Sequence, residues 1–198
     1  EETGAAQPKV IDFGIAKDPD QALTVGSSPM GTYAYMPPEQ ADPLRTDIDT
    51  RADVYSLGVI LYELLTGSIP FNPSDFSDRG VSEFQRALRE DDPPRPSTRI
   101  TTMEAAEGSA ISEARATQSA TLASTLRREL EWIPLKALRK EPDERYESAA
   151  ALGEDVRRYL RGEALEAGPE STGYRLRKFV AKRRVPIAAT GMFVAILV

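Results

Sequence analysis

The segment from Thr50 to Gly67 constrains the fold of this chain more than any other segment. Four of its apolar residues form a stripe along one helical face: Val54, Leu57, Leu61 and Leu64. Ile60 and Leu65 widen this stripe. A helix that is apolar on several sides has to be buried among other elements. The spacing of Thr50 and Asp53 fits a capping box, and Thr66-Gly67 fits a helix C-terminus. The sequence therefore predicts a central helix over about 51–66.

Weaker helical patterns follow this segment. Phe84 and Leu88 lie on one face of an expected helix, and the final helices are expected over about 128–160. Residues 101–125 are rich in Ala, Ser and Thr, which indicates an insertion with a weakly packed helix near Ser112–Leu126. Only Lys9-Val10-Ile11 indicates a strand. We therefore predict a mainly α fold with a short β hairpin remnant at the N-terminus.

Between the strand and the central helix lies a long irregular segment. From Asp18 to Asp49 no helical or strand period persists, and Pro, Gly, Ser and Asp recur. Irregular segments of this length are uncommon in compact domains unless they carry function. We therefore predict a functional loop.

Two absences in the composition limit the chemistry. The 198 residues include no Cys and no His. Disulfides, thiol nucleophiles, Ser-His-Asp triads and metal sites built on Cys or His are therefore excluded within this chain. The remaining candidates are carboxylates, hydroxyls, Lys, Arg and bound cofactors.

Four motifs stand in order along the chain: Val10–Lys17 with Asp-Phe-Gly inside it, Gly31–Glu39 ending in Pro-Pro-Glu, Asp53–Val59, and Gly67–Phe71. In this order and spacing they resemble the C-terminal half of a bacterial serine/threonine protein kinase domain, over roughly residues 8–160. The resemblance implies part of the large lobe of the kinase fold. It also implies transfer of phosphate to protein Ser and Thr, with ATP and Mg²⁺ as cofactors.

By this resemblance Asp12 is the ligand of the Mg²⁺ that bridges the ATP phosphates, a role that suits a carboxylate oxygen. Without the later motifs, Asp12 would be interpreted as a polar residue at a strand-to-turn transition. Phe13 would pack against the regulatory helix of the small lobe, and Gly14 would let the backbone turn. Thr32 matches the Thr that bridges the catalytic Asp and a nearby Lys in serine/threonine kinases.

Residues 12–39 would then be the activation segment. Thr24, Ser27 and Ser28 are its candidate phosphorylation sites, because a phosphate could order the segment by pairing with Arg. Hydroxyl residues are also common in solvated loops, so both interpretations stay open.

Three further residues are expected to have architectural roles. In the family, the Glu that ends the activation segment forms a buried ion pair, which here implies Glu39 with Arg145. Pro37 stands where the family usually has Ala. Asp53 can favour the helix start. The resemblance implies a second role, in which Asp53 accepts hydrogen bonds from the backbone of the catalytic loop, and both roles can hold at once.

The C-terminal region differs in charge from the rest. Residues 163–184 carry a net charge of +3 and residues 1–162 carry −9, and residues 185–198 are uncharged. As a helix, this uncharged stretch would be about 21 Å long, short of the roughly 30 Å of a bilayer core, so a core or interfacial helix is the alternative by length. We expect the start of a transmembrane helix, because the dense basic flank fits the cytoplasmic side of a membrane.

The predicted organisation is a partial kinase domain over 1–162, a basic juxtamembrane linker over 163–184 and a truncated transmembrane helix over 185–198. The junction resembles that of planctomycete-type kinases. This predicts a single-pass plasma-membrane protein with a cytoplasmic kinase portion. No nucleic-acid partner is expected, because the basic run has no aromatic platform or fold motif. Dimerisation stays open.

The glycine-rich loop, the phosphate-binding Lys and the catalytic loop are missing from these 198 residues. We therefore expect a serine/threonine kinase fragment that is inactive alone. The alternative is a membrane-tethered pseudokinase or docking module. In the complete protein the expected partners are protein substrates, ATP and the membrane.

Overall fold

The computed structural model describes residues 34–42, 45, 47–76, 78–107 and 119–182, and these residues form helices without any strand. The helices are α1 (Arg51–Thr66), α2 (Val81–Glu90), α3 (Pro96–Glu107), α5 (Ser119–Thr125), α6 (Trp132–Ala137), α7 (Ala149–Leu160) and α8 (Thr172–Lys182). Short 3-10 turns cover Pro73–Phe76 and Pro142–Glu144, and a π-helical turn covers Leu126–Leu130. The mainly α prediction is confirmed. The expected β hairpin and the expected transmembrane helix at 185–198 lie outside the described residues.

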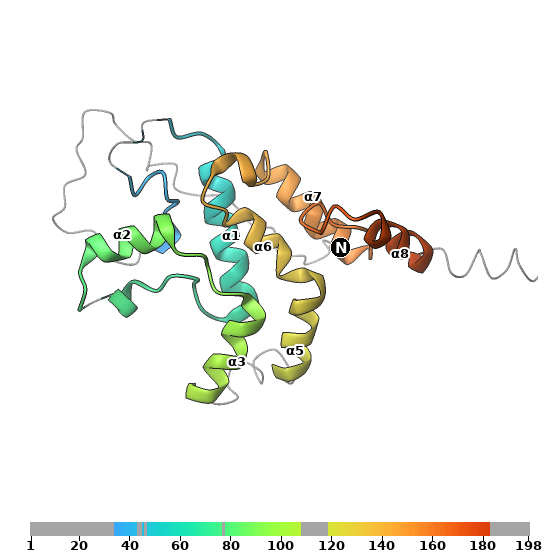
Figure 1. Cartoon of the computed structure of the whole chain (residues 1–198), viewed down its shortest axis with the longest axis horizontal. Helices are drawn as coiled ribbons and strands as arrows, with labels where there is room; N and C mark the ends of the chain where they lie inside the picture. The colour runs from blue at the N-terminus through green and yellow to red at the C-terminus, as the bar shows by residue number, and fades with distance from the viewer. Residues whose placement is uncertain (1–33, 43–44, 46, 77, 108–118, 183–198) are drawn as a thin grey trace, which may run out of the picture.

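Helix α1 lies in the middle of the molecule (Figure 1) and contacts α3, α6 and α7. Val54, Tyr55, Val59 and Tyr62 on α1 are fully buried, because apolar side chains of the surrounding helices cover them. Gly58 lets α6 approach closely, since a Cβ at this position would lie 2.7 Å from the Cβ of Ala137. Three residues of the predicted apolar stripe are exposed on the outer side of α1: Leu57, Ile60 and Leu64. The prediction that the whole stripe is buried is therefore wrong, because α3, α6 and α7 pack against the other side of the helix.

The start of α1 differs from the predicted capping box. Thr50 makes no side-chain hydrogen bond to the helix, because its own backbone is already helical, with φ −62° and ψ −12°. A capping residue normally has extended backbone angles that turn its side chain toward the free N–H groups. The carboxylate of Asp49 caps instead, and its Oδ1 accepts a hydrogen bond from the backbone N–H of Arg51 at 2.8 Å. The capping-box prediction was therefore wrong by one residue.

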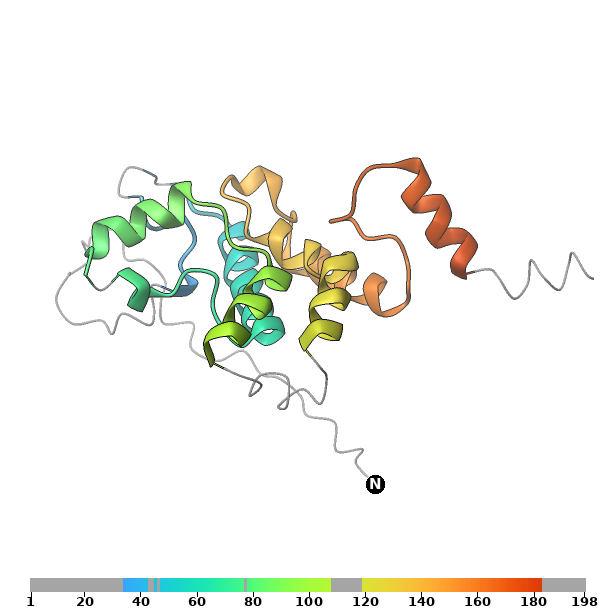
Figure 2. The ribbon, with the colours of Figure 1, turned by 60° about the horizontal axis from the view of Figure 1, so that its bottom comes forward.

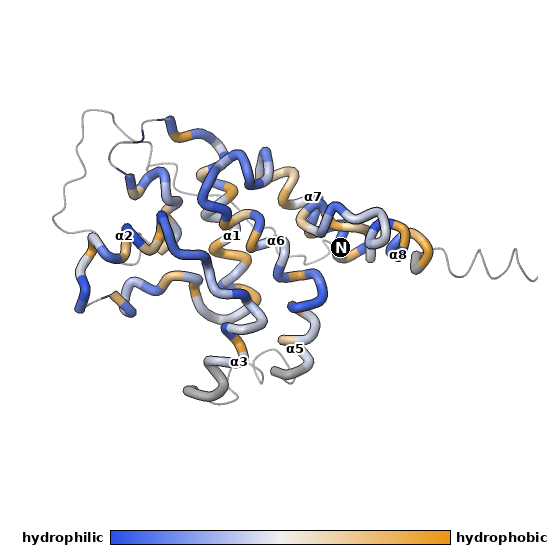
Figure 3. The backbone as a smooth tube through the Cα atoms, viewed as in Figure 1, coloured by the Kyte–Doolittle hydropathy of each residue, from blue (hydrophilic) through white to orange (hydrophobic). Residues whose placement is uncertain are grey.

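A smaller core lies beside α2. Phe84, Ala87 and Leu88 on one face of α2 pack against Phe71 and Ala41. Figure 3 shows hydrophilic residues along α2 and along the connection from α2 to α3. Helix α2 is therefore amphipathic, as its spacing predicted.

Helices α3 and α5 pack against each other where the sequence indicated an insertion. Helix α3 extends through Glu107, so the first part of the Ala-, Ser- and Thr-rich stretch continues a regular helix. Helix α5 covers Ser119–Thr125, within the range expected for a helix there. Residues 108–118 lie outside the described residues.

The segment after α7 packs against the lobe over part of its length. Leu165 is buried in the same cluster as Val54 and Ile133, and Tyr174 on α8 is also buried. Figure 2 shows α8 at the edge of the molecule, joined to α7 by an extended connection. The region expected to be a linker therefore contains core residues. None of the helices in the described ranges combines the length and the apolar character needed to cross a bilayer.

Candidate functional site

The best-defined polar site is a buried ion pair between Glu39 and Arg145. The guanidinium Nη1 and Nη2 of Arg145 donate to Oε1 and Oε2 of Glu39, each at 2.7 Å. The Arg145 side chain is 0% exposed and that of Glu39 is 4% exposed. This two-pronged geometry is the strongest form of Arg–carboxylate pairing. The pair that the sequence predicted is present.

Arg145 has further acceptors that complete its hydrogen bonding. It donates to the backbone carbonyls of Arg139 at 2.7 Å, Lys140 at 2.9 Å and Arg51 at 3.0 Å. Its guanidinium also lies over the ring of Tyr55, 5.1 Å from the ring centroid. Burial raises the pKa of the Tyr55 hydroxyl, so this ring stays neutral beside the cation.

The ion pair joins distant parts of the chain. Glu39 and Arg145 are 106 positions apart. Because Arg145 also binds the carbonyl of Arg51, the end of the motif at residues 31–39 is fixed to the start of α1 and to the loop before α7. The site is therefore an anchor for the segment that ends at Glu39.

The remaining predicted site residues are distributed differently. Asp53 lies in the first turn of α1 with an exposed side chain. The others lie outside the described residues: Asp12, Phe13, Gly14, Thr24, Ser27, Ser28 and Thr32. Within the described part of the chain, no cluster of acidic side chains is arranged to hold a metal ion.

Comparison with known proteins agrees with the order of motifs along the chain. Residues 2–155 match the family model described as the protein kinase domain. The chain belongs to the protein kinase family. Its mainly helical architecture around α1 fits the large lobe of such a kinase.

Several bacterial serine/threonine kinases are similar to this chain. PknB of Mycobacterium tuberculosis is 39% identical over 163 residues, which cover 80% of this chain and 21% of that protein. PknB of Mycobacterium leprae is 38% identical over 162 residues, with the same coverage. Pkn1 of Myxococcus xanthus is 39% identical over 146 residues, covering 73% of this chain and 17% of that kinase. The chain thus spans about a fifth of the length of these curated relatives.

Lys140 makes a partly buried polar contact in the kinase lobe that sequence reasoning missed. Its ammonium donates to the backbone carbonyl of Leu88 at 2.7 Å and lies over the ring of Phe71, 4.6 Å from the ring centroid. Lys140 therefore caps the C-terminal end of α2, where helix carbonyls are unpaired. Burial lowers the pKa of Lys140 to about 8.

Asp155 is the second missed residue, and it joins α7 to the segment that follows. Its Oδ1 accepts a hydrogen bond from the backbone N–H of Glu166 at 2.7 Å. Its Oδ2 accepts from the backbone N–H of Ala167 at 2.9 Å and from the hydroxyl of Tyr146 at 2.8 Å. Asp155 is fully buried. Burial and the neighbouring Asp155 carboxylate raise the pKa of Tyr146.

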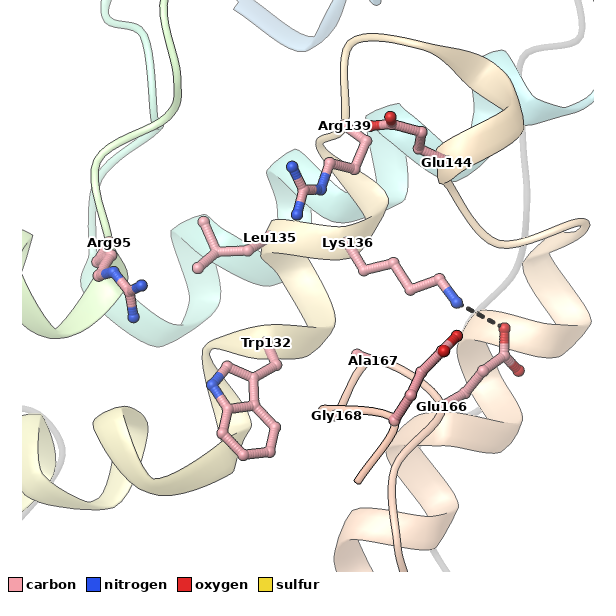
Figure 4. A pocket seen from close by; sticks show the side chains of 10 residues that line it. Arg95, Trp132, Leu135, Lys136, Arg139, Glu144, Glu166, Ala167 and Gly168 are labelled. Atoms are coloured by element: carbon pink, nitrogen blue, oxygen red, sulfur yellow. Dashed lines mark hydrogen bonds and ion pairs between the residues drawn. The ribbon is translucent and has the colours of Figure 1, made fainter. Parts of the chain in front are cut away.

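The same segment forms one wall of a cavity of about 430 Å³, with α6 on the other side (Figure 4). Lys136 reaches across the cavity to Glu166, with 2.8 Å between its ammonium and the carboxylate. Trp132, Arg139 and Gly168 also line it. The ion pair between Lys136 on α6 and Glu166 on the segment therefore links the two walls of the cavity.

Proposed function

We propose that the protein containing this chain is a serine/threonine kinase that transfers the γ-phosphate of ATP to hydroxyl groups of other proteins. The observation that carries the proposal is the buried Glu39–Arg145 pair at the end of the expected activation segment. Membership of the protein kinase family and similarity to bacterial serine/threonine kinases support it.

In this proposal the nucleotide site depends on Asp12, whose carboxylate would hold the Mg²⁺ on the ATP phosphates. When bound, Mg²⁺ neutralises charge that develops on the phosphates. Thr32 would position the catalytic carboxylate of the complete kinase. Glu39 and Arg145 would hold the end of the activation segment so that a protein substrate meets a fixed surface.

We also propose that these 198 residues do not transfer phosphate by themselves. The sequence has no glycine-rich phosphate loop, and without His it has no His-Arg-Asp catalytic loop. Magnesium-dependent phosphorylation of a generic protein substrate by the purified 198-residue chain would contradict this part of the proposal.

The proposed location is the plasma membrane, with a single span beginning in residues 185–198 and the kinase portion on the cytoplasmic side. The supporting observation is the order of charges, with a basic run directly before an uncharged apolar stretch. A planctomycete-type architecture is proposed on the same junction.

The test uses the full-length protein that contains this chain. We expect Mg²⁺-dependent incorporation of radiolabelled phosphate from ATP into a Ser- or Thr-containing substrate. Asp12→Asn should reduce the rate by at least about 100-fold, because the metal loses its charged ligand. Asp18→Asn, a nearby substitution of the same kind, should leave the rate unchanged.

Two results would overturn the kinase proposal. One is a full-length wild-type protein that transfers no phosphate with Mg²⁺ and ATP, which would decide for a pseudokinase or docking module. The other is equal activity of the Asp12→Asn and Asp18→Asn variants.

A further inference from the structure

Helix α8 is held against the lobe along one side. The ring of Tyr174 packs edge-on against Trp132, with ring centroids 5.7 Å apart, and its hydroxyl accepts a hydrogen bond from the backbone N–H of Leu165 at 3.2 Å. One turn further along, Lys178 forms a mostly buried ion pair with Glu129. Residues four apart lie on the same face of a helix. The side of α8 that carries Tyr174 and Lys178 therefore faces the lobe.

The opposite side of α8 is apolar and exposed to solvent. Leu176, Phe179 and Val180 are 63%, 53% and 41% exposed. Their spacing of three and four residues places them on one face. At about 100° per residue, this face points away from the one that carries Tyr174 and Lys178. Docking on the lobe thus presents the apolar face outward.

The charges around this face are all of one sign. Arg175 and Arg177 flank it within α8, and the sequence continues with Lys182, Arg183 and Arg184. No acidic residue occurs from Ser171 to Val198. A partner for this face must therefore be both apolar and negatively charged.

The geometry points to an anionic lipid surface as that partner. We infer that α8 lies in the plane of a bilayer surface, with Leu176, Phe179 and Val180 below the headgroups and the arginines among the phosphates. Basic amphipathic helices bind membranes in this way, through buried apolar area together with attraction to anionic lipid. A bilayer surface supplies both properties over the whole length of α8.

The size of the face sets the character of the binding. Three apolar side chains bury little area, so the electrostatic part is needed, and binding is reversible and weakened by salt. The inference extends the proposed membrane location, but it requires neither kinase activity nor a span formed by residues 185–198. Because α8 is fixed to the lobe, adsorption also fixes which side of the lobe faces the bilayer.

The test measures co-sedimentation of the purified 198-residue chain with phosphatidylcholine vesicles, with and without phosphatidylglycerol. We expect tighter binding to the anionic vesicles and weaker binding at high salt. Leu176→Glu should raise the apparent Kd for anionic vesicles by about tenfold or more. The matched control is Leu160→Glu on α7, a site that is 76% exposed and makes the same change in charge, and it should bind as the wild type does.

A second variant and a structural measurement keep the test decisive. Arg175→Gln combined with Arg177→Gln should also weaken binding by about tenfold, because each basic residue near an anionic surface contributes to attraction. The near-ultraviolet circular dichroism of the Trp132–Tyr174 pair should not change in any variant, which shows that α8 stays docked.

Three results would overturn the inference. Equal binding to neutral and anionic vesicles would place membrane affinity elsewhere in the chain. Equal changes in vesicle binding for Leu176→Glu and Leu160→Glu would show that α8 is not part of the membrane-binding surface. If Leu176→Glu converts a dimer to a monomer in analytical ultracentrifugation and leaves vesicle binding unchanged, the face is an interface between two copies of the chain.

Discussion

The ion pair between Glu39 and Arg145 gives the sharpest prediction about stability. Glu39→Gln keeps the size of the side chain and removes its charge. Because the guanidinium of Arg145 is 0% exposed, it would stay buried without a counter-charge. Losing one partner of a buried pair typically costs about 3–5 kcal/mol, against about 5–15 kcal/mol for the total stability of a domain.

The contacts of Arg145 predict which single variant, Glu39→Gln or Arg145→Met, loses more stability. After Glu39→Gln, the guanidinium still donates to the carbonyls of Arg139, Lys140 and Arg51, so the cost should lie near about 3 kcal/mol. Arg145→Met leaves the Glu39 carboxylate and these carbonyls without their donor, at about 1–3 kcal/mol for each buried group that stays unpaired. The Arg145→Met variant should therefore be the less stable of the two. The double variant Glu39→Gln, Arg145→Met should lose less than the sum of the two single losses, since it leaves no buried charge.

The assay is urea denaturation of the 198-residue chain, followed by far-ultraviolet circular dichroism. The matched control is Glu154→Gln, which breaks a pair with a distance of 2.6 Å between Glu154 and Arg161, at side chains that are 40% and 45% exposed. Solvent screens that pair, so the control should unfold like the wild type. A loss below about 1 kcal/mol for Glu39→Gln, or additive losses in the double variant, would refute the reasoning.

Three further predictions concern other parts of the fold. Gly58→Ala should lower the melting temperature, with a cost of about 1–3 kcal/mol from overpacking where its Cβ would lie 2.7 Å from α6, whereas Gly153→Ala, with 3.9 Å to its nearest neighbour, should not. Asp155→Asn should speed hydrogen exchange at the two backbone N–H groups that the carboxylate binds, while exchange in α2 stays unchanged, because an amide cannot accept all three hydrogen bonds. The depressed pKa of Lys140, about 8, means that the unfolded chain binds more protons than the folded chain above pH 8. The free energy of unfolding should therefore rise by about 1 kcal/mol between pH 8 and pH 9.5. Urea titrations at a series of pH values should show a smaller rise for Lys140→Met.

Sequence reasoning succeeded where the deciding information is local or belongs to an ordered motif. The apolar period of residues 51–66 lies within one helix, so spacing alone predicted the helix. Spacing did not identify its buried side, because Leu57, Ile60 and Leu64 of the apolar stripe are exposed. Glu39 and Arg145 were matched through motifs, although their contact spans most of the chain. No local pattern could have joined these two residues.

Other features depended on backbone angles or on returning segments. Asp49 and Thr50 are both good capping residues one position apart, and only the incoming backbone decides which of them faces the helix. Asp155 occupies a position in α7 that is typical of a solvated acidic residue. It is buried because residues 165–167 return to α7, a course that no periodicity in the sequence indicates. Lys140 finds its acceptor 52 positions earlier, at the end of α2.

The contacts of Asp155 have a practical consequence for producing this domain. The family match ends at residue 155, in the middle of α7. A recombinant protein cut at that boundary would lack half of the last lobe helix, the backbone donors at residues 166 and 167, and the buried Leu165. The packed lobe therefore extends beyond residue 155, where the family match ends. A recombinant protein that ends after Tyr174 should be more stable than one that ends at residue 155.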